Sequence, residues 1–244
     1  MSVCFPDSCV VAWRNLFRPK ALRCEIDWNT EFGNANPLDI EIGMGNGLWL
    51  RQFAGLHPER RLVGIEFVGE YVRETSRRAV RDKQSNMRLL CADARLALPL
   101  LFEDASLTNI YVNFPDPWFK KRHKKRRLLN GAFLRMLSQK MAVGGKLYVV
   151  TDDPEYCNFA LESVGSVSAF AKEFEGHHLS ELPGYPQTKY ERKWRAQGKE
   201  IFYMLYTNTL NDVIPFDEYL ERQQLQYPMK KLRGEEDIKA IIHG

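Results

Sequence analysis

The sequence of 244 residues lacks the features that hold a chain in a membrane. No apolar stretch approaches the ~18 residues that a transmembrane helix needs, and the richest run, at 96–102, is interrupted by Pro99. The N-terminus has no basic segment leading into an apolar one, so no secretory signal is evident. We therefore expect a cytoplasmic protein with no membrane partner.

The sequence also lacks the cysteine and histidine motifs that are typical of disulfide and metal sites. The five cysteines are an odd number, no two of them form a CxxC pair, and the five histidines form no HExxH motif. Neither a zinc ribbon nor a thioredoxin-type site is therefore supported. We expect reduced thiols and no bound metal.

Outside one segment, the chain has no excess of positive charge. It has 35 Lys and Arg residues against 31 Asp and Glu residues, a formal net charge of +4. Residues 120–127 read KKRHKKRR, and without their seven Lys and Arg the balance is 28 basic against 31 acidic. A cluster of this kind is typical of phosphate-backbone contact. The alternatives are a solvated charge run and a localisation signal.

Hydrophobic residues make up 44% of the chain and charged residues 27%, as in an average globular protein. Apolar runs alternating with helical spacing predict strands at 38–43, 61–66, 87–93, 107–114 and 146–152, and helices at 47–57, 70–83, 128–141 and 154–164. This alternation predicts an α/β fold with a parallel sheet. We expect Gly144–Gly145 to end the third of these helices.

The regions around this core are less regular. Residues 181–194 show no clear period, and 200–208 form a β-rich run that an edge hairpin would use. We predict three parts: an N-terminal arm at 1–36, a main domain at 37–208, and a partly helical C-terminal extension at 209–244.

A glycine-rich turn follows the first predicted strand. It reads Glu41-Ile-Gly43-Met-Gly45-Asn-Gly47 and leads into a helix. Glycines permit positive φ and close approach of the backbone to a ligand, which in such sheets binds beyond the carboxyl ends of the strands. The third glycine comes one residue too early for the dinucleotide pattern, so a phosphate cradle is not supported. A simple tight turn is the alternative.

Carboxylates follow the next strands. Glu66 lies about 20 residues past the glycines and suits two ribose hydroxyls. Asp93 suits an adenine amine, or else caps a helix. Together with Glu41, and without a compensating arginine, these groups favour a ligand that carries ribose, adenine and a positive charge. S-adenosylmethionine answers that description.

Three further segments are expected at the same edge of the sheet, where the parallel strands have their carboxyl ends. The loop 113–118, NFPDPW, is stiffened by two prolines, which hold Asp116 near the mouth of the sheet, although a plain turn is the alternative. Thr151-Asp152 ends the fifth strand. Residues 188–195 interleave aromatics with cations, a composition that suits RNA as well as a loop packed over the sheet edge.

In order, the segments EIGMGNG, GIE, CADA, NFPDPWFKKRHKKRR, TDD and TKYERKW resemble the tRNA (guanine-N7-)-methyltransferases over residues 37–208. The resemblance implies a Rossmann-like class I methyltransferase with a seven-stranded, mostly parallel sheet, an antiparallel last strand and helices on both faces. It further implies methyl transfer from S-adenosylmethionine to N7 of guanine 46 in the variable loop of tRNA, giving 7-methylguanosine.

The same resemblance implies roles for individual residues. Cofactor contacts would be Glu41, Gly43, Gly45, Gly47, Glu66, Asp93 and Asp116, with Asp116 also the catalytic residue. Substrate contacts would be Lys120, Asp152, Thr188, Lys189, Tyr190 and Glu191. RNA would be held by Arg122, His123, Lys124, Lys125, Arg126 and Arg127. Whether Asp152 or Asp153 faces the base stays open, as does the choice between monomer and homodimer.

Guanine N7 carries a lone pair and no proton, so the reaction needs no general base. Orientation and electrostatics should carry the catalysis, and Asp152 is suited to accept hydrogen bonds from guanine N1–H and N2–H. Three alternatives remain on the residues alone. They are a nicotinamide-dependent oxidoreductase, a methyltransferase for exocyclic amines, whose [DN]PP[FYW] motif is absent, and a non-catalytic RNA-binding module.

Overall fold

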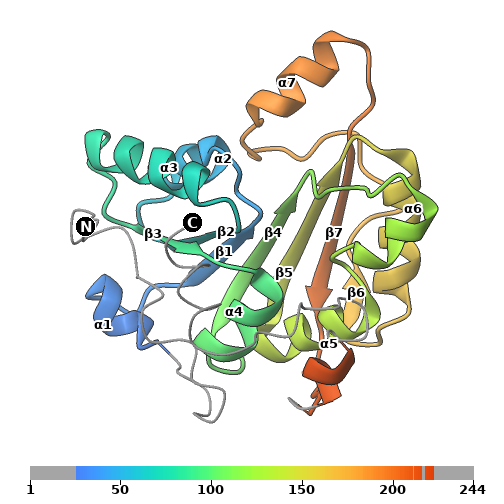
Figure 1. The fold of residues 1–244 in the computed structure, drawn as a ribbon, viewed down its shortest axis with the longest axis horizontal. Helices are drawn as coiled ribbons and strands as arrows, with labels where there is room; N and C mark the ends of the chain where they lie inside the picture. Colours follow the sequence, from blue (N-terminus) through green and yellow to red (C-terminus); the bar gives the residue numbers. More distant parts are fainter. Residues whose placement is uncertain (1–25, 211, 216–217, 223–244) are drawn as a thin grey trace.

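A computed structural model describes residues 26–210, 212–215 and 218–222. Most of the predicted arm and extension, together with Cys4, Cys9 and Cys24, lies outside the described residues. The core is one seven-stranded sheet in the order β3-β2-β1-β4-β5-β7-β6 (Figure 1). Its strands are β1 (Leu38–Ile42), β2 (Arg61–Glu66), β3 (Met87–Cys91), β4 (Leu107–Asn113), β5 (Met141–Thr151), β6 (Phe170–Lys172) and β7 (Phe202–Asn208).

Helices separate the strands along the chain. They are α1 (Trp28–Phe32), α2 (Leu48–Leu56), α3 (Gly69–Arg81), α4 (Ala94–Leu101), the 3₁₀ helix η1 (Lys121–Arg126), α5 (Gly131–Lys140), α6 (Pro154–Gly165) and α7 (Lys189–Ala196). One hydrophobic cluster packs α2 and α3 against one face of the sheet, and a larger cluster packs α4, α5 and α6 against the other. The predicted α/β fold with helices on both faces is confirmed.

Strand directions follow from the pairing. β1 is parallel to β2 and β4, β2 to β3, and β4 to β5, whereas β7 is antiparallel to both β5 and β6. The antiparallel last strand is therefore confirmed. The strand β7 lies inside the sheet, and β6 forms the edge. In place of the predicted hairpin, β6 and β7 form an antiparallel pair, and α7 lies between them in the sequence.

The predicted end of the helix before β5 was wrong. The helix α5 begins after Asn130, whose side chain accepts a hydrogen bond from the Phe133 amide at 3.1 Å, and it ends at Lys140. Gly144 and Gly145 lie within β5, where the pairing with β4 shifts register. A side chain at Gly145 would collide with the β4 backbone, so the glycine permits close strand approach rather than ending a helix.

The helices α1, α4, η1 and α7 were not predicted, and two of them, α4 and α7, are instructive. The helix α4 contains Pro99, which cannot donate to the carbonyl of Arg95; the hydroxyl of Tyr219 donates to that carbonyl instead, at 2.7 Å. The segment predicted to be irregular at 181–194 contains the start of α7. There, Thr188 caps the helix and accepts a hydrogen bond from the Glu191 amide at 2.9 Å.

Parts of the predicted arm and extension pack on the domain. The Trp28 ring stacks on Phe102 with centroids 4.9 Å apart, and its indole N–H donates to the Leu101 carbonyl at 3.2 Å. Tyr219, from the C-terminal side, is buried against α4. The division into three parts stays a prediction. Within the described ranges, no helix is long and apolar enough to cross a membrane.

Candidate active site

The parallel strands place the predicted residues at one edge. The glycine loop follows β1, Glu66 ends β2, Asp93 follows β3, the loop from Phe114 follows β4, and Asp152 follows β5. In Figure 1 the helix α7 lies beyond the ends of β4 and β5, at the same edge. The fold thus brings together segments from residue 41 to residue 196.

Glu66 and the glycine loop hold each other. Oε2 of Glu66 accepts a hydrogen bond from the Gly45 amide at 2.9 Å, and Oε1 accepts one from the Val68 amide at 2.8 Å. The φ angles of Gly43, Gly45 and Gly47 are 75°, 53° and 65°. A Cβ at Gly43 or Gly45 would meet open space, whereas one at Gly47 would collide with a side chain of α3. The loop is therefore open on its outer side and packed at its end.

Glu41 is a buried carboxyl with one unused oxygen. It is 2% exposed; Oε1 accepts a hydrogen bond from Asn113 Nδ2 at 2.9 Å, and Oε2 has no hydrogen-bond partner among the described residues. Burial raises the pKa of Glu41 to about 8, Glu66 adds to that rise, and the Asn113 side chain and the Leu50 amide oppose it. An orphaned carboxyl oxygen beside an open glycine loop suits a ligand that carries positive charge.

Asp93 is engaged by the protein. It caps α4, with Oδ1 accepting from the Arg95 amide at 3.0 Å, and its carboxylate forms an ion pair with the Arg95 side chain. The helix-cap alternative from the sequence is therefore observed. The adenine contact stays a prediction, and the nearby arginine was not foreseen.

Asp116 lies in a constrained, exposed loop. Phe114 and Trp118 have φ angles of 49° and 48°, which side chains rarely adopt, and Asp116 Oδ1 accepts a hydrogen bond from the Trp118 amide at 3.0 Å. The Phe114 amide donates to the Val150 carbonyl at 2.8 Å and so ties the loop to β5. The carboxylate of Asp116 is thereby held in place while it remains open to solvent.

Some side chains of the basic run, residues 120–127, are exposed to solvent, and others are paired within the protein. Lys120, Arg122 and Lys125 are exposed. The Lys124 ammonium lies 2.6 Å from a Glu155 oxygen, and Arg127, which is only 5% exposed, donates to the same oxygen at 2.6 Å.

Arg127 also donates to the Pro117 carbonyl at 2.9 Å and so joins the proline loop to α6. Arg126 lies over the Trp118 ring, 5.0 Å from its centroid. Partial desolvation and then the neighbouring cations Arg126, Arg122 and Lys120 lower the pKa of His123.

The two aspartates after β5 have different partners. Asp153 caps α6 and accepts a hydrogen bond from the Tyr156 amide at 2.6 Å. Asp152 Oδ2 lies 3.4 Å from Nζ of Lys199, which follows α7. Asp153 is thus used by the helix, and Asp152 faces the side on which α7 lies.

The four residues predicted at 188–191 are placed differently. Thr188 caps α7, and Lys189 begins it. Tyr190 is 48% exposed, with its ring 5.4 Å from that of Phe114. Glu191 is 1% exposed; its Oε1 accepts hydrogen bonds from the Tyr203 hydroxyl and from Arg195 Nε. Tyr190 is therefore open to a substrate, whereas Glu191 points into the protein.

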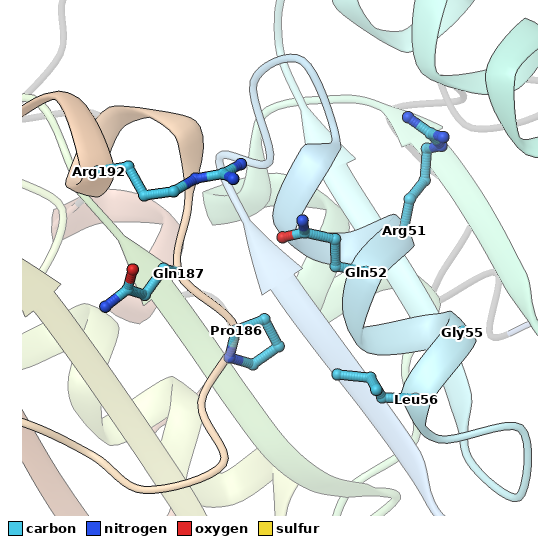
Figure 2. A pocket seen from close by; sticks show the side chains of 7 residues that line it. All are labelled: Arg51, Gln52, Gly55, Leu56, Pro186, Gln187 and Arg192. Carbon is cyan, nitrogen blue, oxygen red and sulfur yellow. The ribbon is translucent and has the colours of Figure 1, made fainter.

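A groove opens beside the site, between α2 and the segment that leads into α7. It is a shallow hollow of about 590 Å³ that is largely open to solvent. Figure 2 shows Gln52 and Leu56 of α2 facing Pro186 and Arg192 across it, and Gln187 also lines it. The residues of α2 that line the groove were not predicted from the sequence, because a solvent-facing Gln or Leu on a helix carries no signal by itself.

The described residues hold no group of three or more His, Cys, Asp or Glu side chains that could bind a metal ion. Cys91 and Cys157 are free thiols.

The strand order, the antiparallel β7 and the helices on both faces define a Rossmann-like methyltransferase fold. The 16S rRNA methyltransferase KamB has this fold, with a TM-score of 0.56 at 15% identity, over 78% of this chain and 97% of that one. A family described as "Putative methyltransferase" matches residues 35–204.

The tRNA (guanine-N(7)-)-methyltransferase of Thermotoga maritima is 35% identical over 193 residues, which are 79% of this chain and 60% of that protein. The one of Geobacter metallireducens is 35% identical over 192 residues, 78% of this chain and 91% of that protein. The chain belongs to the tRNA (guanine-N7-)-methyltransferase family.

Proposed function

We propose that this protein transfers a methyl group from S-adenosylmethionine to N7 of guanine 46 in the variable loop of tRNA, giving 7-methylguanosine. One observation carries the proposal. At a single sheet edge, an acidic glycine loop lies on one side of a constrained Asp116 loop, and the exposed basic residues of η1 continue the chain on the other. Membership of the family supports the same reaction. A cytoplasmic location and a tRNA partner are part of this proposal.

The residues at this edge suit the cofactor. The orphaned Oε2 of Glu41 would face positive charge, the open loop from Gly43 to Gly47 would lie along the ligand, and Glu66 would accept from ribose hydroxyls. Asp93 would have to reach the adenine amine while it also pairs with Arg95. When bound, S-adenosylmethionine supplies a methyl group on a cationic sulfur.

The chain has to orient the base and stabilise charge. Because guanine N7 has a lone pair and no proton, no residue has to act as a general base. Asp116 provides a fixed negative charge near the purine, on which positive charge appears during transfer. Asp152 would accept from guanine N1–H and N2–H, which adenine lacks, and so select guanine.

RNA contacts are proposed for those residues of the basic run that are not buried. Lys120 would touch the substrate nucleotide, and phosphates would meet Arg122, His123, Lys124, Lys125 and Arg126. We leave Arg127 out of this set, because it is buried and paired with Glu155. Tyr190 offers an exposed ring for stacking, and Thr188, Lys189 and Glu191 would shape the pocket around it.

The test is a methylation assay with identification of the product. The protein is incubated with methyl-labelled S-adenosylmethionine and unmodified tRNA, and the RNA is digested to nucleosides. We expect label in 7-methylguanosine, and none when position 46 of the tRNA carries adenine. Label in another nucleoside would refute the proposed chemistry, and equal label with the adenine tRNA would refute the proposed position.

A further inference from the structure

Two hydrogen bonds link three segments that are far apart in sequence. The Tyr185 hydroxyl donates to Asn113 Oδ1 at 2.7 Å, and Asn113 Nδ2 donates to Glu41 Oε1 at 2.9 Å. Asn113 ends β4, Glu41 lies in β1, and Tyr185 lies between β6 and α7. The chain of bonds therefore connects the segment that leads to Thr188 with the acidic edge of the sheet.

Each bond fixes the direction of the next. The Asn113 amide has an acceptor end and a donor end of nearly the same shape. The donated hydrogen bond from Tyr185 occupies the acceptor end, so the donor end points at Glu41. This holds Oε1 of Glu41, while its buried Oε2 has no partner among the described residues.

We propose that Asn113 and Tyr185 are positioning residues: they hold the Glu41 carboxyl so that its second oxygen is presented to the positively charged end of the cofactor. The inference deepens the proposed function and rests on the cofactor role of Glu41 given there. No motif of the sequence analysis assigned Tyr185 a role, and Asn113 entered it only as the first residue of the proline loop.

The groups around Glu41 agree with this role. Burial is the main influence that disfavours ionisation of Glu41, and Glu66, at the end of β2, adds to it. Asn113 favours ionisation, as does the Leu50 amide of α2, although that amide forms no hydrogen bond with Oε2. Burial, and then the charge of Glu41, raises the pKa of Tyr185 well above its ordinary value. The Tyr185 hydroxyl therefore keeps the proton that it must donate to Asn113.

The hydroxyl of Tyr185 can be removed without removing its ring. The ring packs against Trp49 at 5.2 Å and against Tyr148 at 5.8 Å, contacts that phenylalanine would keep. Tyr148 offers a matched control. It stacks on Tyr111 in the same cluster, and no hydrogen bond of its hydroxyl is found within the described part of the chain.

The first experiment is a double-mutant cycle on the full-length protein, with S-adenosylmethionine affinity measured by calorimetry. We expect Tyr185→Phe to raise Kd about 3- to 10-fold, the size of one lost hydrogen bond. In the Glu41→Gln background, the same change should alter Kd by less than about twofold, because the carboxylate that it positions is gone. Tyr148→Phe should leave Kd unchanged.

The outcomes separate two claims. An unchanged Kd in Tyr185→Phe, or an equal loss in both backgrounds, would refute the positioning role, because Tyr185 would then act independently of Glu41. If Glu41→Gln alone leaves Kd unchanged, the cofactor role of Glu41 in the proposed function fails first.

A second experiment needs no cofactor. In protein labelled with ¹³C at glutamate carboxyls, the Glu41 resonance is followed against pH in the wild type and in Asn113→Ala. Loss of a donor to the charged form should move the midpoint to higher pH. An unchanged midpoint would show that Asn113 does not control Glu41 and would overturn the proposal.

Discussion

Asp39 and Glu41 are two buried carboxyls on the same face of the same strand, yet only Asp39 has both of its oxygens hydrogen-bonded within the described structure. Asp39 is fully buried, and the Arg60 side chain donates to both of its oxygens. The Asn109 amide adds a bond to Oδ1 at 2.9 Å. Glu41, two residues nearer the carboxyl edge, has one donor from a side chain and an orphaned Oε2.

Under the proposed function, the difference separates an acid that stabilises the fold, Asp39, from one that contacts the cofactor, Glu41. Burial raises the pKa of both groups, so the shift alone does not distinguish them. Their hydrogen-bond partners do, because a buried charge that is fully paired stabilises the fold, whereas a buried oxygen without a partner is available to a ligand. We therefore propose that Asp39, at the amino end of β1, contributes to stability and that Glu41, at its carboxyl end, contributes to cofactor binding.

The largest expected effect lies at the carboxyl end, at Asp116. Asp116→Asn keeps the shape and the acceptor for the Trp118 amide but removes the charge. We expect kcat to fall about 100-fold or more, the size of one preorganised electrostatic interaction, with little change in cofactor or tRNA affinity. Steady-state kinetics test this. A loss confined to KM would make Asp116 a binding residue only, and normal kinetics would remove it from the active site.

At the amino end, Asp39→Asn should act on stability. Removal of the charge leaves Arg60 partly buried without its ion partner, so the free energy of unfolding should fall by about 3 kcal/mol. Denaturant titration measures this, and activity per folded molecule should stay normal. A variant as stable as the wild type, but with weakened cofactor binding, would reverse the assignment of the two ends.

Glu66→Ala should weaken cofactor binding by about 1–3 kcal/mol, because charge-assisted hydrogen bonds to the ribose are lost and the Gly45 amide loses its acceptor. Calorimetry on the folded variant measures this. Unchanged affinity would show that Glu66 only holds the glycine loop.

The basic run also contains both kinds of residue, one proposed to bind phosphate and one that stabilises the fold. If Lys125 meets a phosphate, Lys125→Gln should reduce the slope of log K for tRNA against log salt by about 0.7–0.9. Arg127→Gln should leave that slope unchanged and instead lower the unfolding midpoint, because Arg127 is buried against Glu155. Equal slopes in the wild type and Lys125→Gln would make Lys125 a solvated residue.

The sequence predicted the sheet well because β1 to β4 are short apolar runs that begin at the predicted residues. It failed where a distant contact decides the structure. Pro99 argues against a helix, because proline has no N–H to donate to the Arg95 carbonyl. Only the fold shows that the Tyr219 hydroxyl donates to that carbonyl instead.

The missed start of α7 did leave a signal, since Thr188 and Glu191 have the spacing of a capping box. At the edge of the sheet, acidic residue types and their order were predictable. Their partners were not, because the Tyr185–Asn113–Glu41 bonds and the burial of Arg127 depend on which segments the fold brings into contact.

We propose that Glu41 is positioned for a cationic ligand, and the pH dependence of cofactor binding tests this role. The pKa of Glu41 is raised to about 8, so below that pH the cofactor-free protein keeps a proton that a bound cation would displace. Calorimetry from pH 6.5 to 8.5 should therefore show S-adenosylmethionine affinity rising with pH by up to about tenfold per unit and levelling above the pKa. In Glu41→Gln the affinity should be weaker and should not rise with pH across this window. The same affinity and the same pH dependence in both proteins would contradict a role of Glu41 in binding the cation.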